Sequence, residues 1–340
     1  MSETNRRVVV TGAGGFLGRH LTLSLLQQDF SVRGTFRSAV RGKQAKMALE
    51  ERQGQPAGKL TIALADLESD EGWPEALKGA DALFHTASPF PAKTPDDPQD
   101  VIRPAVEGTR RVLRAAADAG IRRVVLTSSI AAVMYGDGVP PYDERNWTDA
   151  DGTFATTYYA SKTLAERAAW AEAETLGLDL TVLCPGMILG PMIGKTAATS
   201  VGIVRNLLNG RYPAMPKFTV PVVDVRDVAA AHVLALRTEA SIGERIILAG
   251  QSLSVVEIVA ILRDAFPERA GKLPGMTVPN WTARAAASMH PGLAMIVKEL
   301  GRDNRVTSEK ARRLLGWTSR PEREAVAATA ESLITAGLIV

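Results

Sequence analysis

The sequence predicts an α/β fold in which a doubly wound parallel sheet is joined by a smaller C-terminal lobe. Short β-branched or apolar runs recur through the first half of the chain, and helical patterns with apolar residues at three- and four-residue spacing lie between them. Strands that alternate with helices in this way form a parallel sheet covered by helices on both faces. At 340 residues the chain is long enough for about two domains.

Six short runs are expected to form the strands of this sheet, and each is bounded by Gly, Asp or Pro. They are residues 7–11, 31–36, 59–64, 81–86, 123–127 and 178–183. Helices are expected at residues 16–28, 102–119 and 158–176. Gly120 and Gly177 follow two of these helices at positions that favour a left-handed C-cap residue, which supports the predicted helix ends.

The pattern becomes less regular after Pro185, in a stretch rich in Gly, Pro and Met. Beyond this stretch, strands are expected at residues 220–225 and 245–248, and helices at 227–237 and 254–265. Two more helical stretches complete the chain. We therefore expect a first domain at residues 1–185, with elements from about 220–250 returning to it, and a second lobe at residues 186–219 and 251–340.

Composition and charge exclude several classes of protein. The 40 Lys and Arg residues and 37 Asp and Glu residues leave a net charge of +3, too small to predict nucleic-acid binding. The single cysteine, Cys184, excludes an intramolecular disulfide or a thiolate-rich zinc site, and the four histidines lack metal-ligand spacing. The longest charge-free stretch, residues 180–194, is too short and too rich in Gly and Pro for a membrane span. Without a signal-peptide pattern, we expect a cytoplasmic protein with no metal and no membrane partner.

A glycine-rich turn with the pattern T-G-x-x-G-x-x-G leads from the first predicted strand into the first predicted helix. It contains Thr11, Gly12, Gly15, Phe16, Leu17 and Gly18. The first glycine permits a sharp turn, the second lets backbone N–H groups approach a diphosphate, and the third lets the helix pack closely on its strand. The alternative is a tight turn without a ligand. We expect residues 1–185 to be a Rossmann-type dinucleotide-binding domain and these residues to contact the cofactor.

The end of the second predicted strand indicates which dinucleotide is bound. An acidic residue there holds the ribose 2′-OH of NAD, whereas a basic residue accommodates the 2′-phosphate of NADP. The stretch from residue 30 to residue 49 has no acidic side chain. Its basic residues are Arg33, Arg37, Arg41, Lys43 and Lys46. We predict NADP(H) as the cofactor, in contact with Arg37 and Lys43. The alternative is a solvated basic face at the start of a helix.

A second group of residues has the chemistry for carbonyl reduction. Ser128 and Ser129 follow the strand at 123–127, and Tyr158 and Lys162 lie four residues apart, on one face of the predicted helix. A phenol has a pKa of about 10, and a neighbouring ammonium favours its ionised form. We expect Tyr158 to be the proton donor, Ser129 rather than Ser128 to hydrogen-bond the carbonyl oxygen, and Lys162 to assist Tyr158. Tyr158 and Lys162 are also expected beside the cofactor, with Lys162 on the nicotinamide ribose.

With these motifs the sequence resembles the extended short-chain dehydrogenase/reductases of the NAD-dependent epimerase/dehydratase superfamily. Segments 142–147 (YDERNW) and 158–170 (YYASKTLAERAAW) resemble most the branch of dihydroflavonol 4-reductases, cinnamoyl-CoA reductases and microbial aldehyde and ketone reductases. The resemblance implies NADPH-dependent reduction of an aldehyde or ketone to an alcohol. It also implies further cofactor contacts at Asp66, Leu67, Thr86, Ala87, Ser88, Pro185, Met187, Ile188 and Ser200.

One departure from that branch bears on the substrate. Where dihydroflavonol reductases carry an Asn against the flavonoid ring, this chain has Met134. The difference implies a more apolar small-molecule carbonyl substrate. The expected walls of its pocket are Phe90, Met134, Met192 and Ile193.

Two other functions remain open at this point. A nucleotide-sugar epimerase or dehydratase on the same scaffold would usually favour NAD, which Arg37 argues against. A non-catalytic NADP-binding protein would need the glycine turn but not Tyr158 and Lys162. The natural substrate and the stereochemistry are not predicted, and either a monomer or a homodimer is compatible with the sequence.

Overall fold

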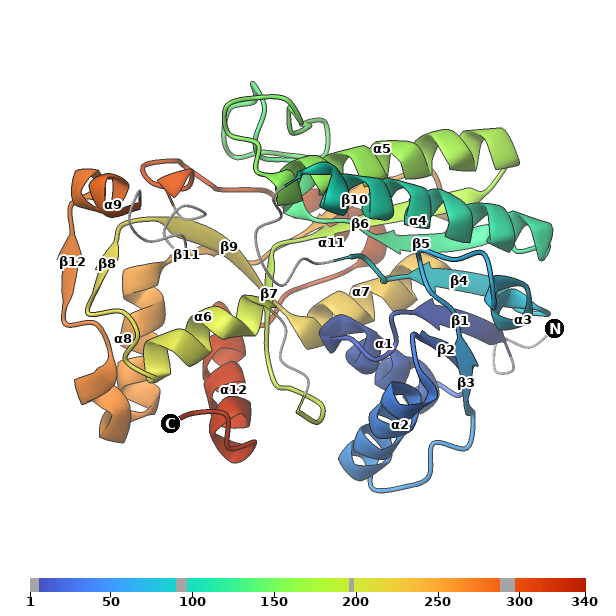
Figure 1. Ribbon diagram of the computed structural model, residues 1–340, viewed down its shortest axis with the longest axis horizontal. Coiled ribbons are helices and arrows are strands. Elements are labelled where there is room, and N and C mark those ends of the chain that lie inside the picture. The colour runs from blue at the N-terminus through green and yellow to red at the C-terminus, as the bar shows by residue number, and fades with distance from the viewer. Residues whose placement is uncertain (1–5, 90–96, 196–198, 288–296) are drawn as a thin grey trace.

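The centre of the fold is a seven-stranded parallel sheet (Figure 1). It is described from a computed structural model, in which residues 6–89, 97–195, 199–287 and 297–340 are placed. The strand order is β10-β6-β5-β4-β1-β2-β3, and all neighbours pair in parallel. The strands are β1 (Arg7–Thr11), β2 (Ser31–Phe36), β3 (Leu60–Leu64), β4 (Ala82–His85), β5 (Arg123–Thr127), β6 (Asp179–Pro185) and β10 (Arg245–Leu248). The predicted α/β class with a doubly wound parallel sheet is confirmed.

All six predicted strands of the first domain join this sheet, and the run predicted at 245–248 is its edge strand β10. The run predicted at 220–225 behaves differently. It forms β9 (Thr219–Asp224), which pairs with β7 (Met187–Leu189) and β11 (Ser252–Ser254) in a separate three-stranded sheet. Strands β8 (Ala214–Pro216) and β12 (Met276–Val278) form a third, two-stranded sheet. Only part of the segment 220–250 therefore returns to the main sheet.

Helices cover both faces of the main sheet. Figure 1 shows α4 and α5 on one face and α1 and α7 on the other. Val8 and Val10 of β1 belong to one buried cluster and Val9 to another, and all three side chains are fully buried. Successive side chains of a strand point to opposite faces, so each face of the sheet has its own core. The helices of this part are α1 (Phe16–Gln27), α2 (Ala39–Gln53), α3 (Trp73–Leu77), α4 (Gln99–Asp118), α5 (Thr157–Leu176), α7 (Val225–Arg237) and α11 (Glu309–Leu315).

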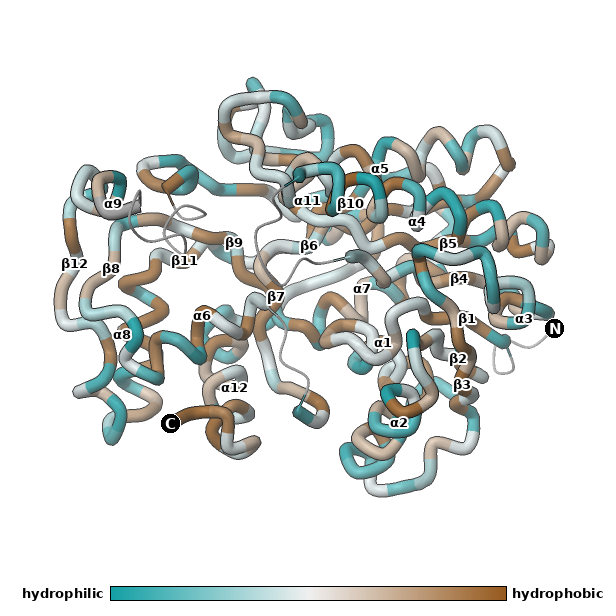
Figure 2. Tube along the Cα trace, viewed as in Figure 1, coloured by the Kyte–Doolittle hydropathy of each residue, from teal (hydrophilic) through white to brown (hydrophobic). Residues whose placement is uncertain are grey.

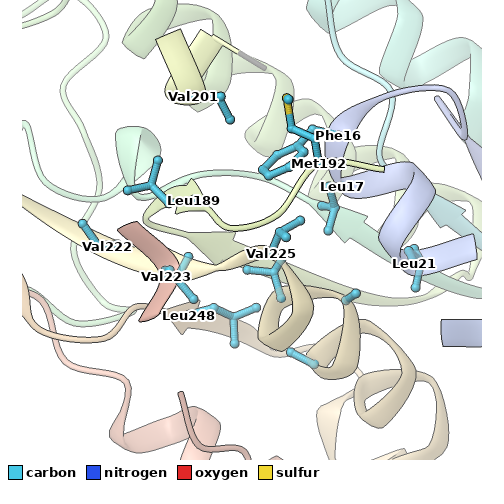
Figure 3. Packing of buried hydrophobic residues seen from close by; sticks show 14 of the residues in the cluster. Phe16, Leu17, Leu21, Leu189, Met192, Val201, Val222, Val223, Val225 and Leu248 are labelled. Carbon is cyan, nitrogen blue, oxygen red and sulfur yellow. The ribbon is translucent and has the colours of Figure 1, made fainter. Parts of the chain in front are cut away.

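The rest of the chain forms a lobe at the other end of the molecule (Figure 1). Its helices are α6 (Thr199–Leu208), α8 (Val255–Ala265), α9 (Asn280–Ala287) and α12 (Glu322–Thr335). Figure 3 shows that one hydrophobic cluster includes residues of α1 together with Leu189, Val201 and Val222 of the lobe. The two parts therefore share a core. Figure 2 shows hydrophobic residues along β1 and hydrophilic ones over α4. None of the described helices is long and apolar enough to span a membrane.

Three histidines are buried, and from their lowered pKa values we predict how the stability of the fold depends on pH. Burial lowers the pKa of His20 and of His232 to about 4, and that of His85 to about 3. Below pH 6.5 the unfolded chain therefore binds protons that the folded chain does not, and we expect the free energy of unfolding to fall as the pH drops from about 6.5 to 4. Each group contributes a slope of up to about 1.4 kcal/mol per pH unit. Urea denaturation across this range measures the slope, and a flat profile would contradict the expectation.

Candidate active site

The glycine turn joins β1 to α1 at the carboxyl edge of the sheet. Gly12 has a φ of +66°, and a Cβ at this position would lie 3.0 Å from the Cα of Ala87. A Cβ at Gly18 would lie 2.2 Å from the carbonyl oxygen of Gly12, so α1 packs directly on the turn. The N–H of Gly15 donates to that same oxygen over 2.9 Å. The turn thus needs glycine at its first and third positions for geometric reasons.

Thr11 joins this turn to the loop after β4. Its side chain is fully buried, its hydroxyl lies 2.8 Å from Nδ1 of His85, and it accepts hydrogen bonds from the N–H groups of Thr86 (3.1 Å) and Ala87 (3.0 Å). Strands β1 and β4 are neighbours at the point where the strand order reverses, which is where open α/β sheets bind ligands. The Thr11 hydroxyl fixes the two loops to each other, and a contact of Thr11 with the cofactor stays a prediction.

Phe16 and Leu17 begin α1 directly after the turn. Each residue is 8 % exposed and its side chain packs in the core. A contact with a diphosphate would therefore be made by N–H groups at the beginning of α1, which is how a helix N-terminus binds an anion.

The basic residues after β2 divide into two groups. Arg37 and Lys43 are exposed where β2 ends and α2 begins. Arg33 instead donates from Nη1 to the carbonyl oxygens of Glu75, Ala76 and Lys78 at the end of α3, over 2.9–3.0 Å. Arg33 therefore stabilises a neighbouring helix, while Arg37 and Lys43 remain available to a 2′-phosphate.

Some of the other expected cofactor contacts follow strands of the main sheet, and the rest lie on β7 and α6. Asp66 and Leu67 follow β3, and Thr86, Ala87 and Ser88 follow β4. Pro185 ends β6 and is buried, while Met187 and Ile188 begin β7 and are partly buried. Ser200 lies on α6, and its hydroxyl donates to the carbonyl oxygen of Ile188 over 2.7 Å.

Ser129, Tyr158 and Lys162 lie together at the carboxyl end of β5. Ser129 follows the strand after one residue, and its side chain is hydrogen-bonded to Tyr158. Tyr158 and Lys162 occupy successive turns of α5, and Nζ of Lys162 lies 5.9 Å from the centre of the Tyr158 ring. Thr156 accepts from the N–H of Tyr159 and so fixes the start of α5 beside the strand.

Burial dominates the electrostatics of these groups. Burial raises the pKa of Tyr158, and the hydrogen bond from Ser129 opposes that rise. Burial lowers the pKa of Lys162 to about 8, against the negative charge of Glu166. Lys162 is expected to lower the pKa of Tyr158. In the protein without a cofactor, burial has the largest effect on this pKa, and it acts in the opposite direction.

The structure separates the two neighbouring serines. Ser128 is 5 % exposed, and its hydroxyl donates to the buried carboxylate of Glu166. Ser129 is partly exposed, and its hydroxyl accepts from the N–H of Ala131 over 3.1 Å while its side chain contacts Tyr158. Ser129 is thus the more accessible of the two serines, and its contact with a substrate stays a prediction.

Three of the four residues expected to line a substrate pocket are buried. Met134 is 2 % exposed and lies in the buried cluster beneath α5. Met192 and Ile193 are 9 % and 3 % exposed, and Figure 3 shows Met192 beside Phe16 in the core. These three side chains are therefore packed into the two buried clusters, and a role in lining a substrate pocket stays a prediction. Phe90 lies outside the described residues.

Comparison with known proteins agrees with this geometry. The family described as "NAD dependent epimerase/dehydratase family" matches residues 8–250. Cinnamoyl-CoA reductase 1 of Petunia hybrida is 39 % identical over 272 residues, which cover 78 % of this chain and 79 % of the relative. Dihydroflavonol 4-reductase of Zea mays is 34 % identical over 269 residues, which cover 77 % and 74 %.

A solved structure extends the likeness to nearly the whole chain. The yeast methylglyoxal/isovaleraldehyde reductase Gre2, complexed with NADPH, matches with a TM-score of 0.79 at 27 % identity, over 98 % of this chain and 100 % of the other. The chain therefore belongs to the NAD dependent epimerase/dehydratase family, in the extended short-chain dehydrogenase/reductase branch.

Proposed function

We propose that this protein is an NADPH-dependent reductase that converts aldehydes or ketones to alcohols. The observation that carries the proposal is the grouping of Ser129, Tyr158 and Lys162 at the sheet edge where the glycine turn also lies. The names of the relatives, a cinnamoyl-CoA reductase and a dihydroflavonol reductase, support a reductase, and the NADPH of the Gre2 structure supports the cofactor.

The residues at this edge fit NADPH. The turn at Gly12 and Gly15 leaves backbone N–H groups of α1 for a diphosphate, and a side chain at Gly12 or Gly18 would collide with Ala87 or with the backbone of the turn and so displace these groups. Arg37 and Lys43 are exposed and would hold the 2′-phosphate. When bound, NADPH supplies the hydride for the carbonyl carbon.

The protein's own residues supply the proton and the orientation. The phenol of Tyr158 is protonated at neutral pH, because burial raises its pKa, so it can donate a proton to the oxygen of the carbonyl. Ser129 would donate a hydrogen bond to the same oxygen and hold it beside Tyr158. Lys162 would bind the nicotinamide ribose and, as an ammonium, stabilise the phenolate that forms when Tyr158 gives up its proton.

The substrate class is tested with a panel of carbonyl compounds. Aliphatic aldehydes, aromatic aldehydes, β-ketoesters and a cinnamoyl-CoA thioester are each incubated with NADPH or with NADH, and oxidation of the cofactor is followed by absorbance. We expect consumption of NADPH with at least one aldehyde or ketone, and a preference for NADPH over NADH. No consumption of either cofactor across the panel would contradict the proposal and would favour an epimerase, a dehydratase or a non-catalytic NADP-binding protein. Cytoplasmic location and the monomeric or dimeric state stay predictions.

Replacing Arg37 with Ala is expected to weaken NADPH binding while leaving NADH binding unchanged. A hydrogen bond between charged groups contributes roughly 1.5–3 kcal/mol, so the dissociation constant of NADPH should rise about ten- to a hundredfold. Fluorescence titration with both cofactors measures the change. Arg52→Ala, an exposed arginine in the last turn of the same helix α2, is the control and should alter neither constant. An unchanged preference in Arg37→Ala would show that the 2′-phosphate is bound elsewhere.

A further inference from the structure

A buried ion pair lies beneath the candidate active site. The side chain of Glu166 on α5 is fully buried and that of Arg245 on β10 is 6 % exposed. Nε of Arg245 donates to Glu166 over 2.5 Å, and Nη2 donates to the other carboxylate oxygen over 3.3 Å. The desolvation of two buried charges offsets most of their attraction, so such a pair is weak evidence for stability. Its contacts with the surrounding residues are therefore more informative.

The pair holds both ends of the short segment that carries Ser129. At one end Ser128 donates its hydroxyl proton to Glu166. At the other end Nη2 of Arg245 donates to the carbonyl oxygen of Ala132 over 2.8 Å. Residues 130–132 form a 3₁₀ turn between these anchors, and the Ser129 side chain caps it. The position of the Ser129 hydroxyl thus depends on Glu166 and Arg245.

Arg245 is itself held in one orientation. Its Nη1 donates to the carbonyl oxygen of Asn146 over 2.5 Å, and its guanidinium carbon lies 3.8 Å from the centre of the Trp147 ring. A planar guanidinium that donates in several directions and stacks on an aromatic ring leaves little freedom to the groups it contacts. The segment 128–132 is therefore tied to β10 as well as to α5.

The same carboxylate acts on Lys162. Glu166 follows Lys162 by four residues on α5, and its negative charge favours the ammonium form of that lysine. The other titratable groups that act on Lys162 from neighbouring strands are His85 on β4 and Cys184 on β6. Burial lowers the pKa of His85 to about 3 and raises the pKa of Cys184, so both are neutral near pH 7. Among these groups, Glu166 supplies the negative charge next to Lys162.

We infer that Glu166 and Arg245 are positioning residues of the active site, which fix the turn that carries Ser129 and keep Lys162 in its ammonium form. This inference rests on the proposed function, because it gives Ser129 and Lys162 the roles described above. Because both side chains are buried, we expect neither to touch the substrate or the cofactor. Their effect is expected on turnover and on the pH dependence of NADPH binding rather than on the KM of the carbonyl substrate.

The test is Glu166→Gln, which keeps an oxygen for Ser128 but removes the charge. In the wild type, NADPH binding should weaken as the pH rises through about 8, where the buried Lys162 loses its proton. The pH midpoint of NADPH binding is the pH at which half of this weakening has occurred. In Glu166→Gln this pH midpoint should move down by roughly one pH unit. The readout is the dissociation constant of NADPH by fluorescence between pH 6 and 10, which needs no turnover. The kcat should fall at least tenfold at pH 7.5, while the KM of the carbonyl substrate stays within about threefold.

Ser128→Ala separates the two roles of the carboxylate. This variant releases one anchor of the segment but leaves the charge of Glu166 in place. The kcat should fall and the pH midpoint of NADPH binding should stay where it is in the wild type. An unchanged kcat in Ser128→Ala would overturn the role in fixing Ser129.

Two further variants control for folding and for general effects of charge. Glu172→Gln removes the carboxylate of another pair on α5, which joins Arg114 over 2.6 Å at the surface, and should leave the pH midpoint unchanged. The double variant Glu166→Gln/Arg245→Met leaves no buried arginine without its carboxylate and covers the case in which the single variant does not fold; its midpoint should also move down. A wild-type midpoint in folded Glu166 variants would overturn the inference. If Tyr158→Phe keeps full turnover, the proposed function itself fails, whatever the Glu166 variants do.

Discussion

Turnover of carbonyl substrates by a Tyr158→Phe variant is expected to fall by a factor on the order of 10²–10⁴, which is what a positioned general acid contributes. The substitution removes the hydroxyl that is hydrogen-bonded to Ser129 but keeps the ring that packs at the start of α5. NADPH binding is expected to stay within about threefold of the wild type, because the glycine turn and Arg37 are untouched. The measurements are steady-state kcat and the dissociation constant of NADPH.

Tyr159→Phe is the matched control for this prediction. Tyr159 is the next residue of α5, and its hydroxyl donates to the buried carboxylate of Glu299 over 2.5 Å rather than to Ser129. Its ring stacks on Tyr135 at 3.9 Å between centres, and the phenylalanine ring can keep that contact. This variant should lose about 1–3 kcal/mol of stability and retain most of its turnover. Equal loss of turnover in both variants would show that Tyr158 acts through packing and not as an acid.

The strands of the main sheet were accessible from the sequence because the central ones are buried on both faces. Such strands read as continuous apolar runs, as Val8, Val9 and Val10 do, and the runs stand out from the helices between them. Helix α2 is different: among its residues only Gly42, Ala45 and Leu49 are buried, so its apolar periodicity is too weak to predict it.

The candidate site could be predicted from the sequence where its residues lie close together along the chain. Tyr158 and Lys162 share a helix, and the glycine turn is one short segment, so spacing alone relates their side chains. Distant partners are not related in this way. Arg33 donates hydrogen bonds to carbonyl groups at the end of α3, and Met134 and Met192 are buried. Both findings depend on which elements pack together in the fold.

The pair of Glu166 and Arg245 illustrates the same limit within the active site. The four-residue spacing from Lys162 to Glu166 is visible in the sequence, and the apolar residues around Glu166 suggest that it is buried. Nothing local indicates its partner, since Arg245 lies 79 residues away on the edge strand. A buried charge in a helix beside a predicted active site is therefore a signal to search for a partner in the fold.

A Gly12→Val variant is expected to lose NADPH binding by more than a hundredfold and to unfold at a lower temperature than the wild type. A β-branched residue at a φ of +66° is strained by roughly 1–2 kcal/mol. Its Cβ would also lie 3.0 Å from the Cα of Ala87, whose own N–H is held by Thr11, so the loop after β4 cannot move away cheaply. The turn must shift instead, and its N–H groups then no longer converge on a diphosphate.

Gly54→Val separates strain from crowding. Gly54 ends α2 at a φ of +68°, almost the same as that of Gly12, but a Cβ there would meet nothing within 4 Å. Both variants should lose the same 1–2 kcal/mol to backbone strain, because the strained angle is the same. Only Gly12→Val should add the clash with Ala87 and the loss of cofactor binding. Thermal unfolding compares them without NADPH and with NADPH at about ten times the wild-type dissociation constant. This NADPH should raise the Tm of Gly54→Val as much as that of the wild type, and should leave the Tm of Gly12→Val nearly unchanged. A stabilised Gly12→Val would mean that the diphosphate is not bound at this turn.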